Sequence, residues 1–160
     1  MCRSFPGAST PPAGSKINPD TFSSPPAYLL AALIVLARYR PRQLRIEGDF
    51  GVIERPVFLA SAANTSSYGG SVPIAPAAVP TDGLLDLCII EGMVVSKALA
   101  LIPAIFRGRH VGHPKVQFVR TRQVRIDADE PLELWADGQR IARTPVTIEA
   151  VPGAIEVIVP

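Results

Sequence analysis

The sequence predicts a mainly β protein, a β-sandwich with two attached helices that follows a disordered tail. Three observations support this fold class. From residue 43 onward, short segments alternate polar and apolar residues, as strands with one solvated face do. Turn pairs such as Asp137-Gly138 and Pro152-Gly153 separate some of them, at a spacing typical of sandwiches or barrel-like sheets. Only two stretches have the character of a helix.

The bulk composition allows one domain with a real core. The chain has 160 residues, 48% of them hydrophobic, and a formal net charge of +2. Because this charge is small and the Arg residues are scattered among strands, we expect no nucleic-acid partner and at most peripheral membrane contact. We do not expect the two cysteines, Cys2 and Cys88, to form a disulfide framework, which fits a cytoplasmic protein.

The first elements are a tail and a helix. Residues 1–26 are rich in Pro, Ser, Gly and Thr without a hydrophobic period, so we expect disorder. The apolar run that follows is shorter than the roughly 20 residues of a bilayer span, and its flanks do not match a signal peptide. We therefore predict a helix over residues 27–39, ended by Pro41 and buried against a domain surface. The predicted domain covers residues 27–160.

The strands follow in order along the rest of the chain. The segment 43–47 alternates, whereas 57–62 and 87–91 are more uniformly apolar and suit central strands. The remaining predicted strands are residues 116–119, 123–127, 132–135, 146–149 and 155–159.

The second helix is expected over residues 96–107. Ser96 can cap its start and Gly108 can end it. Pro103 lies inside this segment and predicts a kink or a break there, because proline lacks the N–H that the helix uses.

A polar loop with paired glycines follows the apolar strand at 57–62. It contains Asn64, Gly69 and Gly70. Glycine permits positive φ angles and close approach of the backbone to a ligand, so these three residues are candidates for cofactor binding. An ordinary connecting loop explains the same residues.

Two Asp-Gly pairs each have a structural and a chemical interpretation. A turn alone explains Asp82-Gly83, but a carboxylate flanked by carbonyls can also hold a Mg²⁺ ion that keeps most of its waters. A hairpin turn likewise explains Asp137-Gly138, yet an exposed Asp at a rigid tip could accept a proton or position a metal.

Two histidines, His110 and His113, lie three residues apart. Zinc takes three or four protein ligands, and no Cys or carboxylate lies near these histidines in sequence. A structural role is therefore favoured over a metal site.

In this order, the four polar segments resemble the C-terminal domain of the diacylglycerol kinase and sphingosine kinase superfamily, above all the bacterial soluble lipid kinases. Each motif alone is weak, but four in the family's order and spacing form a specific signal that covers about residues 27–160. The matching stretches are residues 64–70 with Ile74-Ala75-Pro76, Asp82-Gly83-Leu84-Leu85-Asp86, residues 108–114, Asp137-Gly138-Gln139 and Val151-Pro152-Gly153-Ala154.

The resemblance implies transfer of the γ-phosphoryl group of ATP to a lipid hydroxyl, in a cleft between an N-terminal α/β domain and a C-terminal β-sandwich. A Gly-Gly-Asp-Gly-Thr segment of the N-terminal domain holds the nucleotide in this family. The resemblance also implies that Asp82 binds a structural Mg²⁺ together with the backbone carbonyls of Val79 and Leu84. Asp137 would lie in the cleft, and the position of Gln139 would hold a Glu that acts as general base.

The sequence departs from this pattern in two ways. It contains no Gly-Gly-Asp-Gly-Thr segment and no upstream α/β domain, so we expect ATP to bind only through a partner domain and the chain to be nearly inactive alone. In addition, the Gln139 amide cannot take a proton from a lipid hydroxyl. Asp137, two residues away across the turn, is a candidate substitute.

Three functional hypotheses remain open. The first is the C-terminal domain of a diacylglycerol-type kinase that depends on a separate nucleotide-binding domain. The second is a non-catalytic remnant that binds lipid or protein through a surface including the apolar residues 28–36. The third and weakest is a small metal-binding β protein that uses His110 and His113.

Overall fold

The computed structural model describes residues 39–67 and 72–154. The chain divides into two units, one containing residues 2–39 and one containing residues 40–160, and every element discussed below belongs to the second unit. The predicted tail, nearly all of the predicted helix at 27–39, the predicted strand at 155–159, and Gly69 with Gly70 lie outside the described residues.

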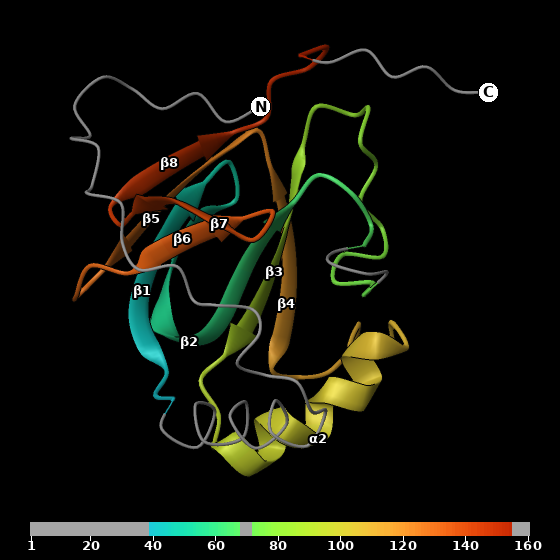
Figure 1. Ribbon diagram of the computed structural model, residues 1–160, viewed down its shortest axis with the longest axis vertical. Coiled ribbons are helices and arrows are strands. Elements are labelled where there is room, and N and C mark those ends of the chain that lie inside the picture. The colour runs from blue at the N-terminus through green and yellow to red at the C-terminus, as the bar shows by residue number, and fades with distance from the viewer. Residues whose placement is uncertain (1–38, 68–71, 155–160) are drawn as a thin grey trace, which may run out of the picture. The chain divides into compact units, whose positions relative to one another are not determined.

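A six-stranded antiparallel sheet with the strand order β4-β3-β2-β1-β5-β8 forms the main body of this unit (Figure 1). This arrangement confirms the prediction of a mainly β protein. The strands of the sheet are β1 (Arg42–Gly48), β2 (Gly51–Ala63), β3 (Leu85–Glu91), β4 (Val116–Thr121), β5 (Gln123–Ala128) and β8 (Val146–Glu149).

β2 is the one strand of the sheet that is much longer than predicted. It begins at Gly51 rather than at residue 57 and runs through Pro56, which pairs with Gln43 of β1. Proline normally argues against a strand interior because it cannot donate a ladder hydrogen bond. Here the carbonyl of Pro56 still accepts a hydrogen bond from the backbone N–H of Gly92, at 2.8 Å.

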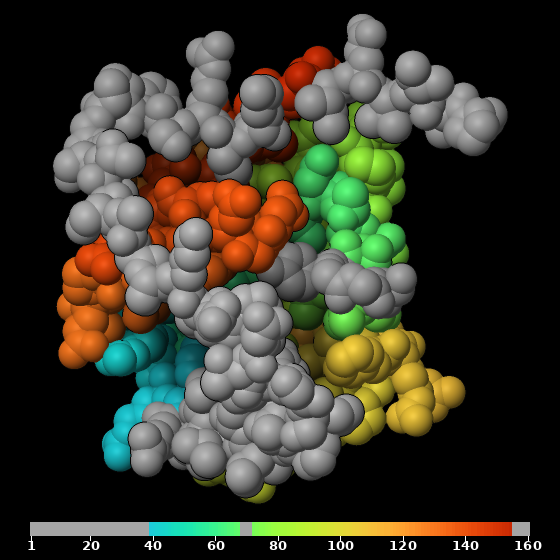
Figure 2. Space-filling view, viewed as in Figure 1, coloured from blue at the N-terminus to red at the C-terminus, as the bar shows by residue number. Residues whose placement is uncertain are grey.

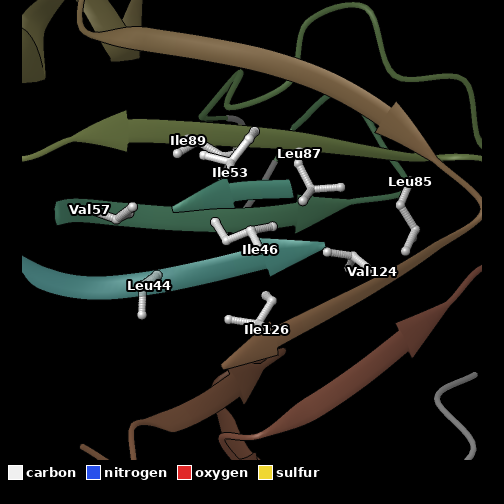
Figure 3. Packing of buried hydrophobic residues seen from close by; sticks show 9 residues of the cluster. All are labelled: Leu44, Ile46, Ile53, Val57, Leu85, Leu87, Ile89, Val124 and Ile126. Atoms are coloured by element: carbon white, nitrogen blue, oxygen red, sulfur yellow. The ribbon is translucent and has the colours of Figure 1, made fainter. Parts of the chain in front are cut away.

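The main core lies on one face of this sheet (Figure 3). In β1 the burial alternates, so that Leu44 and Ile46 are buried while their neighbours are half-buried or exposed. This period of two follows from the pleat, which directs successive side chains to opposite faces. The nine buried residues of the cluster are Leu44, Ile46, Ile53, Val57, Leu85, Leu87, Ile89, Val124 and Ile126.

β3 is buried on both faces, as its uniformly apolar sequence predicts. Leu87 and Ile89 join the main core, whereas Cys88 and Ile90 belong to a second cluster on the other face. That second cluster also contains Leu101 of the helix α2. β3 therefore connects the sheet core to the helix layer.

Helix α2 (Val95–Phe106) confirms the second predicted helix, with two corrections. Ser96 is not the N-cap: the cap is Val94, which offers no side-chain hydrogen bond, and the helix starts one residue earlier than predicted. Of the kink or break predicted at Pro103, the break does not occur, because the helix continues through Pro103 to Phe106. Gly108 ends it as predicted, with a positive φ of 66° that suits glycine. Within the described residues, no helix has the length and apolar character needed to cross a membrane.

A second, two-stranded sheet is formed by β6 (Glu133–Ala136) and β7 (Gln139–Arg143). The Asp-Gly turn between these strands was predicted, but β7 itself was not identified as a strand. Figure 1 shows this hairpin in front of the six-stranded sheet, and Leu132, just before β6, packs against the main core. At its base, the backbone N–H of Leu132 donates to Thr144 Oγ1 at 2.8 Å, which ties the two ends together.

Candidate functional site

The Asp82 turn is a tight loop directly before β3. The backbone N–H of Asp82 approaches the Val79 carbonyl at 3.3 Å, and the N–H of Leu84 donates to Asp82 Oδ1 at 2.9 Å. Gly83 has a φ of 73°, which a residue with a side chain adopts only at a cost. The turn thus connects Asp82 to Val79 and to Leu84 and leaves the Asp82 side chain exposed.

Gly83 also meets the segment that contains Pro152. A Cβ atom at position 83 would lie 3.1 Å from Pro152 Cγ, closer than an ordinary van der Waals contact. The glycine is therefore required by its backbone angle and by its neighbour. Two of the motifs noted in the sequence, Asp82-Gly83 and Val151-Pro152-Gly153-Ala154, touch at this point.

Asp86, near the start of β3, forms an ion pair with Arg120 of β4. They are cross-strand neighbours, and Arg120 Nε donates to Asp86 Oδ1 at 2.9 Å. A second guanidinium N–H of Arg120 donates to the Ala77 carbonyl at 2.7 Å. The hydrogen bond that Arg120 donates to Asp86, together with the negative charge of Asp86, raises the pKa of Arg120, and the charge of Asp82 adds a smaller effect. The sequence did not reveal this pair, because it depends on the register between β3 and β4.

His110 holds the Gly108–Pro114 segment against the Ile74 segment. Its ring is fully buried and lies 5.6 Å, between centroids, from the ring of Phe118. Nε2 lies 3.0 Å from the Ile74 carbonyl, and since a carbonyl only accepts, Nε2 must carry the proton. His110 thus has the structural role that the sequence favoured.

His113 completes a local turn. Its Nδ1 accepts a hydrogen bond from the backbone N–H of Lys115 at 3.1 Å. Within residues 39–67 and 72–154, no group of three or more His, Cys, Asp or Glu side chains is placed to hold a metal ion. Nothing in the described structure therefore supports the hypothesis of a histidine metal site.

A buried junction that the sequence analysis missed connects the β1–β2 turn to the β4–β5 turn. Thr121 Oγ1 accepts a hydrogen bond from the backbone N–H of Asp49 at 3.0 Å and donates one to the Gln123 carbonyl at 2.6 Å. The Asp49 carboxylate accepts the N–H of Arg122 at 3.0 Å, and this bond is the main cause that lowers the pKa of Asp49. A Cβ at Gly48 would lie 2.9 Å from Thr121 Oγ1, so this position needs glycine.

The β6–β7 turn has a different character. Asp137 and Gly138 have φ angles of 51° and 77°, the two consecutive positive values of a type I′ hairpin turn. Asp137 and Gln139 are both exposed. Neither side chain makes a hydrogen bond or ion pair within the described part of the chain. A carboxylate at this tip is rigidly carried and accessible to a reactant.

The hairpin below the turn is held by charges on its strands. Glu133 forms ion pairs with Arg140 at 2.7 Å and with Arg143 at 3.3 Å. The hydrogen bond from Arg140 is the largest cause that lowers the pKa of Glu133. These pairs are exposed, so they stabilise the hairpin weakly but help fix its register.

Asn64 follows the end of β2 and is exposed. Its loop is tied to the Ile74 segment, because the N–H of Ala75 donates to the Ser66 carbonyl at 3.3 Å. The candidate residues Gly69 and Gly70 lie outside the described residues, so their expected role in binding stays a prediction. Described contacts thus link the segments around residues 66, 74, 82, 86, 110 and 120, but not Asp137.

Comparisons with known proteins agree with the resemblance seen in the sequence. Residues 14–159 match the family described as the YegS C-terminal NAD kinase beta sandwich-like domain. Over 134 residues the chain is 37% identical to a diacylglycerol kinase of Mycobacterium tuberculosis, a match that covers 83% of this chain and 43% of that relative. A diacylglycerol kinase of Bacillus subtilis is 26% identical over 113 residues, which cover 71% of this chain and 37% of the relative.

A solved structure shows the same fold. The crystal structure of a diacylglycerol kinase from Bacillus anthracis superposes with a TM-score of 0.59 at 21% sequence identity, over 77% of this chain and 43% of that chain. At this identity the likeness concerns the fold alone. The chain spans less than half the length of each of these relatives.

Proposed function

The chain belongs to the family of the YegS C-terminal domain, and from this premise we propose that it is the C-terminal domain of an ATP-dependent lipid kinase of the diacylglycerol kinase type. The observation that carries the proposal is the 37% identity to a named diacylglycerol kinase over 83% of this chain. The reaction would transfer the γ-phosphoryl group of ATP to a lipid hydroxyl. A nucleotide-binding domain, in this or another polypeptide, would hold the ATP.

The β6–β7 turn is the proposed catalytic element of this domain. A lipid hydroxyl must lose a proton when it attacks phosphorus, and a carboxylate within hydrogen-bond reach can accept it. Gln139 lacks a titratable group, so the proton would go to Asp137 across the same turn. The exposure of Asp137 and its lack of a side-chain partner among the described residues support this role.

The Asp82 turn is the proposed Mg²⁺ site. Its donors are a carboxylate and the carbonyls of Val79 and Leu84, which are the hard oxygen ligands that Mg²⁺ takes. One oxygen of Asp82 already accepts the Leu84 N–H, which leaves the other for the ion. Because the Asp82 side chain is exposed, water can fill the remaining coordination positions. The residues fit the ion, and bound Mg²⁺ would stabilise this turn.

Kinase activity is tested by mixing domains. The purified chain is assayed with and without a candidate nucleotide-binding domain, and labelled phosphate is followed from ATP to diacylglycerol. We expect transfer only in the mixture, and faster transfer with Gln139→Glu because a carboxylate is restored at that position. Absence of transfer in the mixture, even with Gln139→Glu, would reject the kinase and favour the alternative below.

The Mg²⁺ proposal has a readout that does not depend on activity. We expect Asp82→Ala to lower the melting temperature measured in Mg²⁺ by more than Asp129→Ala does, since Asp129 is another exposed Asp that also accepts one local backbone N–H. EDTA should lower the melting temperature of the wild type toward that of Asp82→Ala. A wild type that does not respond to EDTA would show that the ion does not bind there.

The alternative is a non-catalytic module that binds lipid or protein. One specific observation favours it: an amide, Gln139, stands where the resemblance expects a catalytic Glu. In either case we propose a cytoplasmic protein whose contact with membranes is peripheral.

A further inference from the structure

Helix α2 carries a second apolar stripe besides the one that it buries. Ala98 and Leu101 are buried against the cluster that contains Cys88 and Ile90. A separate stripe is formed by Val95, Leu99, Ile102 and Phe106, which lie on one helix face because they are spaced by four, three and four residues. Phe106 is 63% exposed and Ile102 is 37% exposed, so this stripe is not covered as the other is.

The segment around α2 is also basic and contains no acidic residue. Between Met93 and Lys115 there are four Lys or Arg residues and no Asp or Glu. Three of them are exposed and form no ion pair within the described residues, namely Lys97, Arg107 and Arg109. Figure 2 shows part of this segment, in yellow, at the surface.

The basic residues on the strands, unlike those around α2, are paired with carboxylates. Eight Lys or Arg residues of the described chain are paired with carboxylates, and seven of these lie on strands: Arg42, Arg45, Arg55, Arg120, Arg125, Arg140 and Arg143. The expectation that Arg residues belong to solvated strand faces thus holds for these seven. It does not hold for Arg107 and Arg109, whose charges remain uncompensated beside exposed apolar groups.

The exposed Trp135 gives a useful contrast. It lies on the β6–β7 hairpin opposite Arg140, and Arg140 is neutralised by Glu133. An apolar side chain next to a paired charge gives no preference for an anionic partner. The stripe on α2 combines apolar exposure with unpaired positive charge, and these together fit a surface that is anionic outside and apolar beneath.

We propose that α2 docks this domain on an anionic phospholipid bilayer, through a face made of Ile102, Phe106, Arg107 and Arg109. Lys97 lies nine residues before Phe106, on the opposite side of the helix, and is not part of this face. The Ile102 and Phe106 side chains enter the boundary between headgroups and acyl chains, while Arg107 and Arg109 contact lipid phosphates. Because α2 is already fixed to the sheet by Leu101 and its neighbours, docking needs no unfolding. The inference deepens the proposed function, since a kinase that phosphorylates a lipid must reach the bilayer.

The test is co-sedimentation of the full 160-residue chain with vesicles. Vesicles of phosphatidylcholine mixed with phosphatidylglycerol are compared with vesicles of phosphatidylcholine alone. We expect binding to the anionic vesicles, loss of most of it when salt rises from about 0.1 M to about 1 M, and weak binding to the neutral ones. These vesicles contain neither diacylglycerol nor ATP, so a failed kinase assay leaves this result standing, and the reverse also holds.

Substitutions on α2 locate the docking face. The double variant Arg107→Gln/Arg109→Gln should lower the partition coefficient about five-fold for each removed charge. Phe106→Ser should lower it about ten-fold through lost apolar contact. Matched controls on the sheet are Arg45→Gln, which removes an ion-paired charge, and Val52→Ser, which removes another exposed apolar side chain; both should bind as the wild type does.

Three results would overturn the proposal. The first is a wild type that does not sediment with anionic vesicles. The second is α2 variants that bind as well as the sheet controls. The third is a concentration-dependent dimer, seen by analytical ultracentrifugation and dispersed by Phe106→Ser, which would make this face an interface between two copies of the chain.

Discussion

The Asp82 turn and the Asp137 turn are both Asp-Gly turns, but their surroundings differ. Gly83 lies against Pro152, and Asp86, four residues after Asp82, is buried beside Arg120. At the other turn, nothing lies within 4 Å of a Cβ placed at Gly138, and Asp137 is exposed. One turn is built into the fold, and the other projects from it.

This difference predicts that the Asp82 turn acts mainly on stability and that the Asp137 turn acts mainly on chemistry. Contacts at the Asp82 turn and its neighbours join segments that are far apart in the sequence, so substitutions there should act first on stability. The β6–β7 hairpin contributes little to the main core apart from Leu132. Substitutions of the exposed side chains at its tip, Asp137 and Gln139, should therefore act on chemistry and leave the free energy of unfolding almost unchanged.

The largest expected effect comes from the same substitution in the two regions. Ile90 is buried in the cluster under α2, whereas Ile141 lies on β7 and is 42% exposed. We expect Ile90→Ala to lower the free energy of unfolding by about 2–5 kcal/mol through lost burial and a cavity. Ile141→Ala should lower it by less than about 1 kcal/mol. Urea denaturation measures both values, and equal losses would break the distinction.

A smaller effect sharpens the comparison of the turns themselves. Gly83→Ala and Gly138→Ala both place a side chain at a positive φ, which costs about 1–2 kcal/mol. Only Gly83→Ala also meets Pro152, at 3.1 Å. We therefore expect the melting temperature to fall further for Gly83→Ala. If the two variants melt together, the contact with Pro152 does not constrain the turn.

The smallest expected effect is a loss of stability at acid pH. The pKa of Glu91 is lowered below its ordinary value of 4.5, mainly by the hydrogen bond from Lys115 and then by the one from Arg55. The ionised form is therefore favoured in the folded state, so its stabilisation is present above about pH 4.5 and is lost as the pH falls through the lowered pKa. Glu133 follows the same rule in the hairpin.

The measurement is thermal unfolding between neutral and acid pH. We expect Glu91→Gln to reduce the loss of stability in acid more than Glu133→Gln does, because the Glu91 side chain is less exposed and less screened by solvent. The opposite order would mean that the hairpin pairs contribute more than their exposure suggests.

The sequence predicted the elements better than their connections. Alternation in segments such as 43–47 and the hairpin turn at Asp137-Gly138 are local properties, and both were confirmed. Strand β7 was missed although its turn was identified. The start of β2 was missed because Pro56 argues against a strand interior.

The missed contacts depend on strand register rather than on any local pattern. Asp86 meets Arg120 only because β3 and β4 pair as they do, and Thr121 reaches Asp49 across 72 residues of sequence. The prediction that Ser96 caps the helix was wrong for another reason. Ser96 is a good capping residue, but α2 starts at Val95, so Ser96 already lies inside the first turn.

The central claim, that chemistry belongs to the exposed turn, is tested most directly by Asp137→Asn in the mixed-domain kinase assay. Asn keeps the shape of the side chain and tolerates a positive φ, so the fold should be unaffected. We predict that the rate of phosphoryl transfer falls by about 10²–10⁴-fold. The free energy of unfolding should stay within about 0.5 kcal/mol of the wild type. A variant that transfers phosphate at the wild-type rate would contradict the account.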